Sequence, residues 1–169
     1  TFSEGQEPEV VIGLLDRLIG LQVGIVEAHG GDVDKMIGDA ILARFEGTGS
    51  AAGAIAAACA IQHGLDAAGL PIRVGIGVFT GPVVIGAMGA GRRLDYTVIG
   101  DAVNVAARLC SNADADEVVA DHETLAQAGS PADFGSAVEI LSVKGRQAPL
   151  SVQRWRARAV QRAMKAGRS

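Results

Sequence analysis

The chain has 169 residues, of which 49% are hydrophobic and 20% charged, with a formal net charge of −4. This composition is typical of one globular domain with a buried core, and it excludes a disordered chain. No apolar run reaches the roughly 18 residues of a membrane span, and the sequence does not open with a signal-peptide pattern. Two cysteines, Cys59 and Cys110, are too few for a disulfide framework or a zinc site, so we expect free thiols in a reducing, cytoplasmic setting.

The charge is unevenly distributed along the chain. Residues 151–169 contain six basic residues and no acidic one, so the first 150 residues carry a net charge of about −10. An acidic body argues against nucleic-acid binding as the main function.

Hydrophobic spacing predicts a helix over residues 8–29, which Gly30 and Gly31 end. Residues 32–36 and 40–45 have strand character and flank Gly38, which predicts a β-hairpin with a tight turn. Further helices are predicted over 50–68, 102–109 and 122–128, and further strands over 72–78, 83–87, 96–99, 117–120, 138–143 and 151–155. This alternation indicates an α+β or α/β fold with one sheet.

Two shorter features complete the predicted elements. Residues 89–93 are interpreted as a glycine-rich, basic loop, and Asp101 as the N-cap of the helix that follows it. The sequence has no phosphate-binding P-loop, and its histidines share no metal-ligand spacing.

The predicted hairpin places two carboxylates, Asp34 and Asp39, beside Lys35, one of three lysines in the chain. Mg²⁺ is usually held by one or two carboxylates together with substrate phosphates. Asp39 at the turn is therefore a candidate metal ligand, and the alternative is a solvated turn residue.

Two other segments carry polar residues that a core does not need. Asn104 and Arg108 are four residues apart, so they share one helix face, and their neighbours are apolar. A polar pair among packing residues is costly without a partner, and phosphate is a suitable partner for arginine. The alternative is a surface helix. Lys144 lies in a basic turn that is, by itself, ordinary.

Four segments in this order carry a resemblance to a known family. They are residues 31–41, 76–86, 96–108 and 143–145. Together they resemble the catalytic domain of class III nucleotidyl cyclases, of the adenylyl type, over about residues 1–156. This leaves residues 157–169 as a basic C-terminal tail. The resemblance implies a ferredoxin-like α+β domain that works as a head-to-tail homodimer with its active sites at the interface.

The resemblance also implies a role for each candidate residue. Asp39 resembles the second of two metal-binding aspartates, and two Mg²⁺ or Mn²⁺ ions are expected at each site. Asn104 and Arg108 resemble the catalytic pair that orients the ribose and stabilises the reacting α-phosphate. Arg92 and Lys144 resemble the basic residues that bind the substrate's phosphates.

Lys35 and Thr97 occupy the two base-reading positions of the family. Lys35 can only donate a hydrogen bond, whereas the Thr97 hydroxyl can accept one. Adenine offers an acceptor at N1 and a donor at its amine, so the pair suits ATP. Guanylyl members of the family usually carry Glu and Cys here, and a threonine resembles a bacterial-type subgroup.

The implied reaction is an in-line attack of the ATP 3′-hydroxyl on the α-phosphate, which yields cyclic AMP and pyrophosphate. Two metal ions would activate the hydroxyl and clamp the triphosphate. Each site would take Asp39 and Arg92 from one subunit and the remaining residues from the other.

One departure from the family pattern is large. The first family strand, which carries the first metal aspartate, has no counterpart in this sequence. We expect such a strand shortly before Thr1, and we expect residues 1–169 alone to fold poorly and to be nearly inactive. The alternative is a non-catalytic nucleotide-binding or dimerisation module. A diguanylate cyclase is a weaker alternative, because Val33 and Asp34 stand where that family has Glu and Phe.

Overall fold

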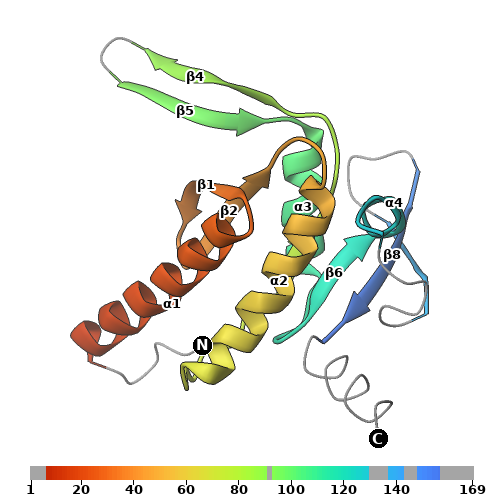
Figure 1. Cartoon of the computed structure of the whole chain (residues 1–169). Coiled ribbons are helices and arrows are strands. Elements are labelled where there is room, and N and C mark those ends of the chain that lie inside the picture. Colours follow the sequence, from red (N-terminus) through yellow and green to blue (C-terminus); the bar gives the residue numbers. More distant parts are fainter. Residues whose placement is uncertain (1–6, 91–92, 130–136, 143–147, 157–169) are drawn as a thin grey trace, which may run out of the picture.

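Helices and strands alternate along the chain, as the sequence predicts (Figure 1). The structure is a computed structural model that describes residues 7–90, 93–129, 137–142 and 148–156. Its helices are α1 (Pro8–Ala28), α2 (Ser50–Ala67), α3 (Asp101–Ser111) and α4 (His122–Gln127). Its strands are β1 (Gly31–Ile37), β2 (Ala40–Phe45), β3 (Ile76–Val78), β4 (Val84–Ala90), β5 (Arg93–Ile99), β6 (Val118–Asp121), β7 (Glu139–Leu141) and β8 (Leu150–Trp155). The predicted α+β class is confirmed.

The strands form three hydrogen-bonded groups, so the prediction of one sheet is wrong for the described residues. β1 and β2 make an antiparallel hairpin, and β4 and β5 make a second one that projects from the body (Figure 1). The remaining strands form a sheet in the order β3-β6-β8-β7, in which only β3 and β6 run parallel. Within the described ranges, no helix has the length and apolar character needed to cross a membrane.

Helix α2 is the centre of the apolar core. Its residues Ile55 and Ala58 pack with β6, α4 and β8, while Ile61 and Leu65 pack with α1 and the β1-β2 hairpin. The alanine-rich sequence of α2 leaves room for these neighbours on several sides. Helix α1 lies beside it (Figure 1), so close that a Cβ at Gly64 would be 3.0 Å from the Ile25 side chain.

The structure corrects three local expectations. The strand predicted over 72–78 covers only Ile76–Val78, because the Val74 carbonyl accepts from the Gln62 side chain (2.7 Å) and the Asp116 amide (3.2 Å) instead of a strand. The loop predicted over 89–93 is shorter, because β4 reaches Ala90 and β5 begins at Arg93. Gly100, and not Asp101, is the N-cap of α3.

Glycine 77 sets the separation between α3 and the sheet. A Cβ built on Gly77 would lie 2.3 Å from the Cys110 amide nitrogen and 2.4 Å from the Ala106 carbonyl oxygen, both in the α3 backbone. Backbone atoms cannot move aside as a flexible side chain can. The helix that carries Asn104 and Arg108 therefore lies on β3 at a distance that only glycine permits.

We predict that Gly77→Ala lowers the free energy of unfolding by about 1–3 kcal/mol, the usual cost of overpacking a core. Urea denaturation of the full-length protein would measure this change. Gly20→Ala is the matched control, because a Cβ there meets nothing within 4 Å and alanine favours the helix. Equal stability of the Gly77→Ala variant and the wild type would show that α3 does not lie this close to β3.

Candidate functional site

The two predicted base-reading residues are in direct contact. Lys35 lies on β1 and Thr97 on β5, 62 residues later, and the Lys35 Nζ donates a hydrogen bond to the Thr97 Oγ1. The Thr97 residue is buried, whereas the Lys35 side chain is 40% exposed. The Lys35 ammonium thus contacts a buried hydroxyl, while part of the Lys35 side chain remains accessible to solvent.

A third residue, Asp34, completes this cluster. Its side chain is only 1% exposed, and its Oδ2 lies 3.1 Å from the Lys35 Nζ and 3.4 Å from the Thr97 Oγ1. Its Oδ1 accepts a 3.1 Å hydrogen bond from the Val98 amide. Asp34 has no place in the base-reading site that the resemblance implies. The signal that could have indicated it is an acidic residue directly before Lys35 and directly after the apolar Val33.

A β-bulge explains how Asp34 reaches β5. In the β1-β2 ladder Val33 pairs with Ala43 and Lys35 with Leu42, so Asp34 is an extra residue without a partner on β2. A bulge bends the strand and changes the direction of a side chain. Here the redirected carboxylate points across to the backbone and hydroxyl of β5.

Arg44 on β2 provides a second cation near the buried carboxylate. Its guanidinium lies 3.8 Å from Asp34, 2.6 Å from Asp32 and 2.8 Å from Glu46. A buried carboxylate is stable only when other groups compensate its charge. Lys35, Arg44 and the Val98 amide supply that compensation.

Asp39, the candidate metal ligand, occupies the hairpin turn. Gly38 has φ = 64°, a conformation that glycine adopts without strain, and the exposed Asp39 follows it. Asp34, the buried carboxylate of the hairpin, is committed to Lys35 and Thr97, and Asp32 pairs with Arg44. Among the described residues, no three His, Cys, Asp or Glu side chains gather as metal ligands. These residues therefore fit one ligand of a divalent ion and do not fit a complete two-metal site.

Helix α3 presents the predicted catalytic pair on its outer side. Val105 and Leu109 are buried at 1% and 0% exposure, whereas Asn104 is exposed and Arg108 is half-buried. The expectation that the pair lies among packing residues is wrong for Asn104, because the apolar neighbours turn to the opposite face. None of the described residues pairs with the Arg108 guanidinium, so its charge is available to an anion.

Three further expectations have different outcomes. Arg92 and Lys144, the predicted phosphate-binding residues, lie outside the described residues. The two cysteines are free thiols, as expected, and both are half-buried. Burial raises the pKa of both the Cys59 and the Cys110 thiol, so both stay protonated at neutral pH and neither is a nucleophile of this site.

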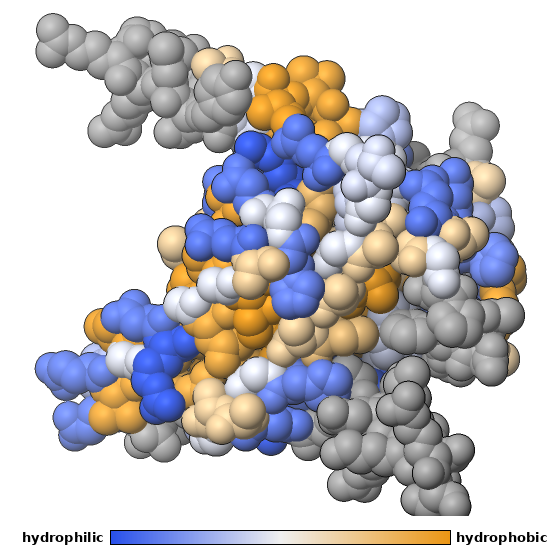
Figure 2. All heavy atoms as spheres, viewed as in Figure 1, coloured by the Kyte–Doolittle hydropathy of each residue, from blue (hydrophilic) through white to orange (hydrophobic). Residues whose placement is uncertain are grey.

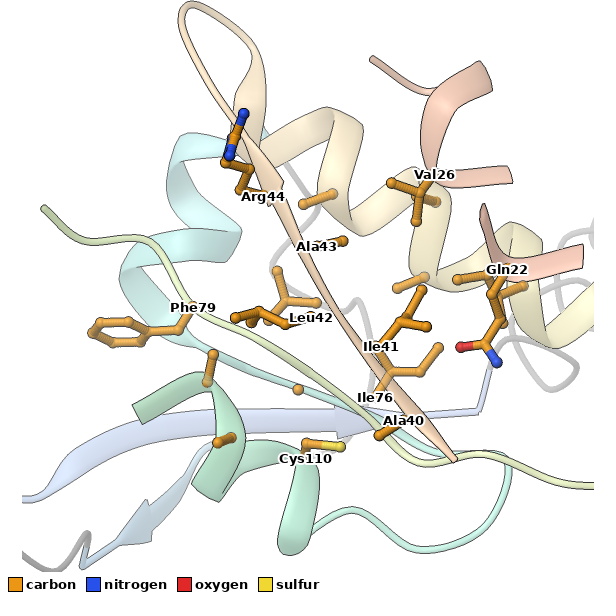
Figure 3. A pocket seen from close by; sticks show the side chains of 18 of the residues that line it. Gln22, Val26, Ala40, Ile41, Leu42, Ala43, Arg44, Ile76, Phe79 and Cys110 are labelled. Atoms are coloured by element: carbon orange, nitrogen blue, oxygen red, sulfur yellow. The ribbon is translucent and has the colours of Figure 1, made fainter. Parts of the chain in front are cut away.

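A cavity of about 710 Å³ separates the β1-β2 hairpin from the four-stranded sheet. Figure 3 shows Ile41 and Ala43 of β2 and Ile76 of β3 among its lining residues. Among the described strands, β2 pairs only with β1, and β3 only with β6, so each has one unpaired edge. Gln22 also lines the cavity, and its buried Nε2 has no partner among the described residues.

Comparison with protein-family models matches residues 1–153 to the adenylate and guanylate cyclase catalytic domain. The chain belongs to this family. The cyclase domain is 40% identical over 121 residues to the adenylate cyclase of Anabaena cylindrica, a match that covers 64% of this chain and 24% of that enzyme. The chain therefore spans only about a quarter of this relative's length.

Two solved structures share the fold of this cyclase domain. The guanylyl cyclase Cya2 superposes with a TM-score of 0.81 at 29% identity, covering 90% of this chain and 83% of that chain. The adenylyl cyclase CyaB from P. aeruginosa superposes with a TM-score of 0.75 at 27% identity, covering 90% and 85%. Because cyclases named for different nucleotides share this fold, side chains must determine which base is read.

Proposed function

We propose that this cyclase domain converts ATP to cyclic AMP and pyrophosphate. The observation that carries the proposal is the contact between Lys35 and Thr97, the two residues at the base-reading positions. Lys35 would donate to N1 of adenine, and Thr97 would accept from its exocyclic amine. Guanine would present an N1 donor to Lys35, which has no acceptor to offer. The similarity to an adenylate cyclase supports the same choice.

The remaining residues would act on the sugar and the phosphates. Asn104 on the exposed face of α3 would orient the ribose by hydrogen bonding. Arg108, one helical turn later, would hold positive charge beside the α-phosphate, where negative charge grows in the transition state. Asp39 would contribute one ligand to a divalent ion, which when bound would act as a Lewis acid on the triphosphate.

We further propose that two copies of the domain share each site. Apolar side chains that a monomer would normally bury are exposed at the end of β1 and at the base of the β4-β5 hairpin: Met36, Ile37, Val84 and Ile99 are 60%, 60%, 69% and 46% exposed. Figure 2 also shows hydrophobic surface gathered at the top of the face in view. A second copy of this chain would cover these side chains and bring the turn of one subunit toward the α3 helix of the other.

The cavity between β2 and β3 supports the expected additional strand. One extended segment in this cavity would supply hydrogen-bond partners to the unpaired edges of both β2 and β3, since neighbouring strands of a sheet lie about 4.8 Å apart. We propose that such a segment, outside residues 1–169, joins the β1-β2 hairpin to the four-stranded sheet and carries a second metal-binding carboxylate.

A non-catalytic nucleotide-binding module is the second candidate. It is favoured by the finding that no three His, Cys, Asp or Glu side chains of the described residues gather as metal ligands. This candidate predicts nucleotide binding without product formation.

Incubation of the full-length protein with ATP or GTP and Mn²⁺ tests the proposal. We expect cyclic AMP from ATP at a rate well above that of cyclic GMP from GTP, because Lys35 can satisfy only an acceptor at N1. Chromatographic detection of both cyclic products decides the outcome. ATP binding without cyclic product would favour the non-catalytic module, and faster turnover of GTP would contradict the assignment of the base.

Exchanging the base-reading pair should change the substrate. Lys35→Glu combined with Thr97→Cys should lower kcat/KM for ATP by at least about tenfold, because one hydrogen-bond mismatch at a buried site costs on the order of 1–3 kcal/mol. Turnover of GTP should improve relative to ATP. Arg17→Glu with Thr48→Cys is the control, because it makes the same change of charge and the same exchange of threonine for cysteine at exposed positions. An unchanged ratio of ATP to GTP turnover in the first variant would refute the assignment.

Mixing two inactive variants tests whether the site is shared. Asp39→Ala and Asn104→Ala should each be nearly inactive alone. A heterodimer of the two should regain part of the wild-type rate, because one of its two sites keeps both residues. Sedimentation would confirm that dimers form, and Asp39→Ala mixed with itself is the control. No recovery in confirmed heterodimers would rule out a shared site.

A further inference from the structure

The Thr97 hydroxyl is chemically ambiguous as a reader of the base. A threonine hydroxyl has one proton to donate and two lone pairs that accept. A freely rotating hydroxyl could therefore accept from the 6-amino group of adenine or donate to the 6-oxo group of guanine. Lys35 does not resolve this choice, because its ammonium donates to the hydroxyl and leaves the hydroxyl proton free.

The Asp34 carboxylate removes the ambiguity. An ionised carboxylate can only accept, so the 3.4 Å contact between Thr97 Oγ1 and Asp34 Oδ2 is a hydrogen bond in which threonine donates. The proton of Thr97 is then directed at Asp34, and one lone pair accepts from Lys35. What remains for a ligand is the second lone pair, which is an acceptor.

The contacts of the Asp34 carboxylate fix its orientation toward the Thr97 hydroxyl. It is the extra residue of the β1 bulge, its side chain is 1% exposed, and its other oxygen accepts from the Val98 amide at 3.1 Å. Two fixed hydrogen bonds on opposite oxygens leave the carboxylate little freedom to rotate. The same carboxylate lies 3.1 Å from the Lys35 Nζ, so it also orients the donor for N1.

We propose that Asp34 is a specificity-determining positioning residue, which fixes the Thr97 hydroxyl as a hydrogen-bond acceptor and so favours 6-aminopurine over 6-oxopurine nucleoside triphosphates. This inference rests on the proposed function. It concerns a residue that acts through Thr97 and Lys35 and is not itself in contact with the base.

Asp34→Asn in the full-length protein tests the proposal. Asparagine has the same shape, and its carbonyl oxygen can still accept from Val98. Its amide would donate to Thr97, which would turn the hydroxyl proton toward the base. The substrates are ATP, inosine triphosphate, and purine riboside triphosphate, which has no group at position 6. We expect the ratio of kcat/KM for inosine triphosphate to that for ATP to rise by at least about tenfold. The advantage of ATP over purine riboside triphosphate should shrink by a similar factor.

Matched variants separate specificity from stability. Asp32→Asn removes another carboxylate of β1. The Asp32 side chain is 63% exposed and pairs with Arg44, so this variant should leave both substrate ratios unchanged. In a Thr97→Val background, Asp34→Asn should no longer change the ratio of inosine triphosphate to ATP, because the hydroxyl is gone. Asp34→Ala, which removes the acceptor of the Thr97 hydroxyl proton, is the second variant if the asparagine variant does not fold.

The outcomes distinguish this proposal from the proposed function. If the wild type prefers inosine triphosphate to ATP, the assignment of ATP and the role of Asp34 are both overturned. If the wild type prefers ATP and the Asp34 variants lose activity equally toward all three substrates, only the role of Asp34 is overturned. A change in the ratios that persists without the Thr97 hydroxyl would also overturn it.

Discussion

A buried carboxylate that joins two hairpins is the interaction on which the candidate base-reading site depends. Without Asp34, the Val98 amide and the Thr97 hydroxyl of β5 would lose their acceptor, and the Lys35 ammonium would lose its counter-charge. Such a network is costly to leave half-satisfied, so it favours one relative position of β1 and β5 over others. Local electrostatics thus fixes the geometry at which the base would be recognised.

A second constraint acts on the other half of the site. The glycine at position 77 allows α3 to rest on the backbone of β3, and this contact sets the height of the helix face that carries Asn104 and Arg108. The buried side chains of Val105 and Leu109 fix the orientation of α3 about its axis, so Asn104 and Arg108 lie on its outer side. The residues proposed to read the base and those proposed to act on the phosphates are therefore positioned by separate parts of the fold.

Most of the elements could be predicted from the sequence, because their signals are local. Helix α1 and the β1-β2 hairpin lie within a residue of the predicted bounds, since spacing and glycines specify them. The short β3 strand could not be predicted from residues 72–78, because its extent depends on what lies across from it. The bulge at Asp34 could not be predicted either, because it depends on how the residues of β1 pair with those of β2. The contact of Lys35 with Thr97 came from the resemblance and not from spacing.

The bulge has a consequence for how this site can change over evolution. Position 34 is skipped by the ladder that pairs Val33 with Ala43 and Lys35 with Leu42, so a substitution there alters neither the pairing nor the alternation of its neighbours. The β1-β2 ladder therefore places no restriction on the residue at this position, which is restricted instead by its contacts with Lys35, Thr97 and Val98. A lineage could thus explore new nucleotide preferences at a small number of sites without first having to rebuild its sheet.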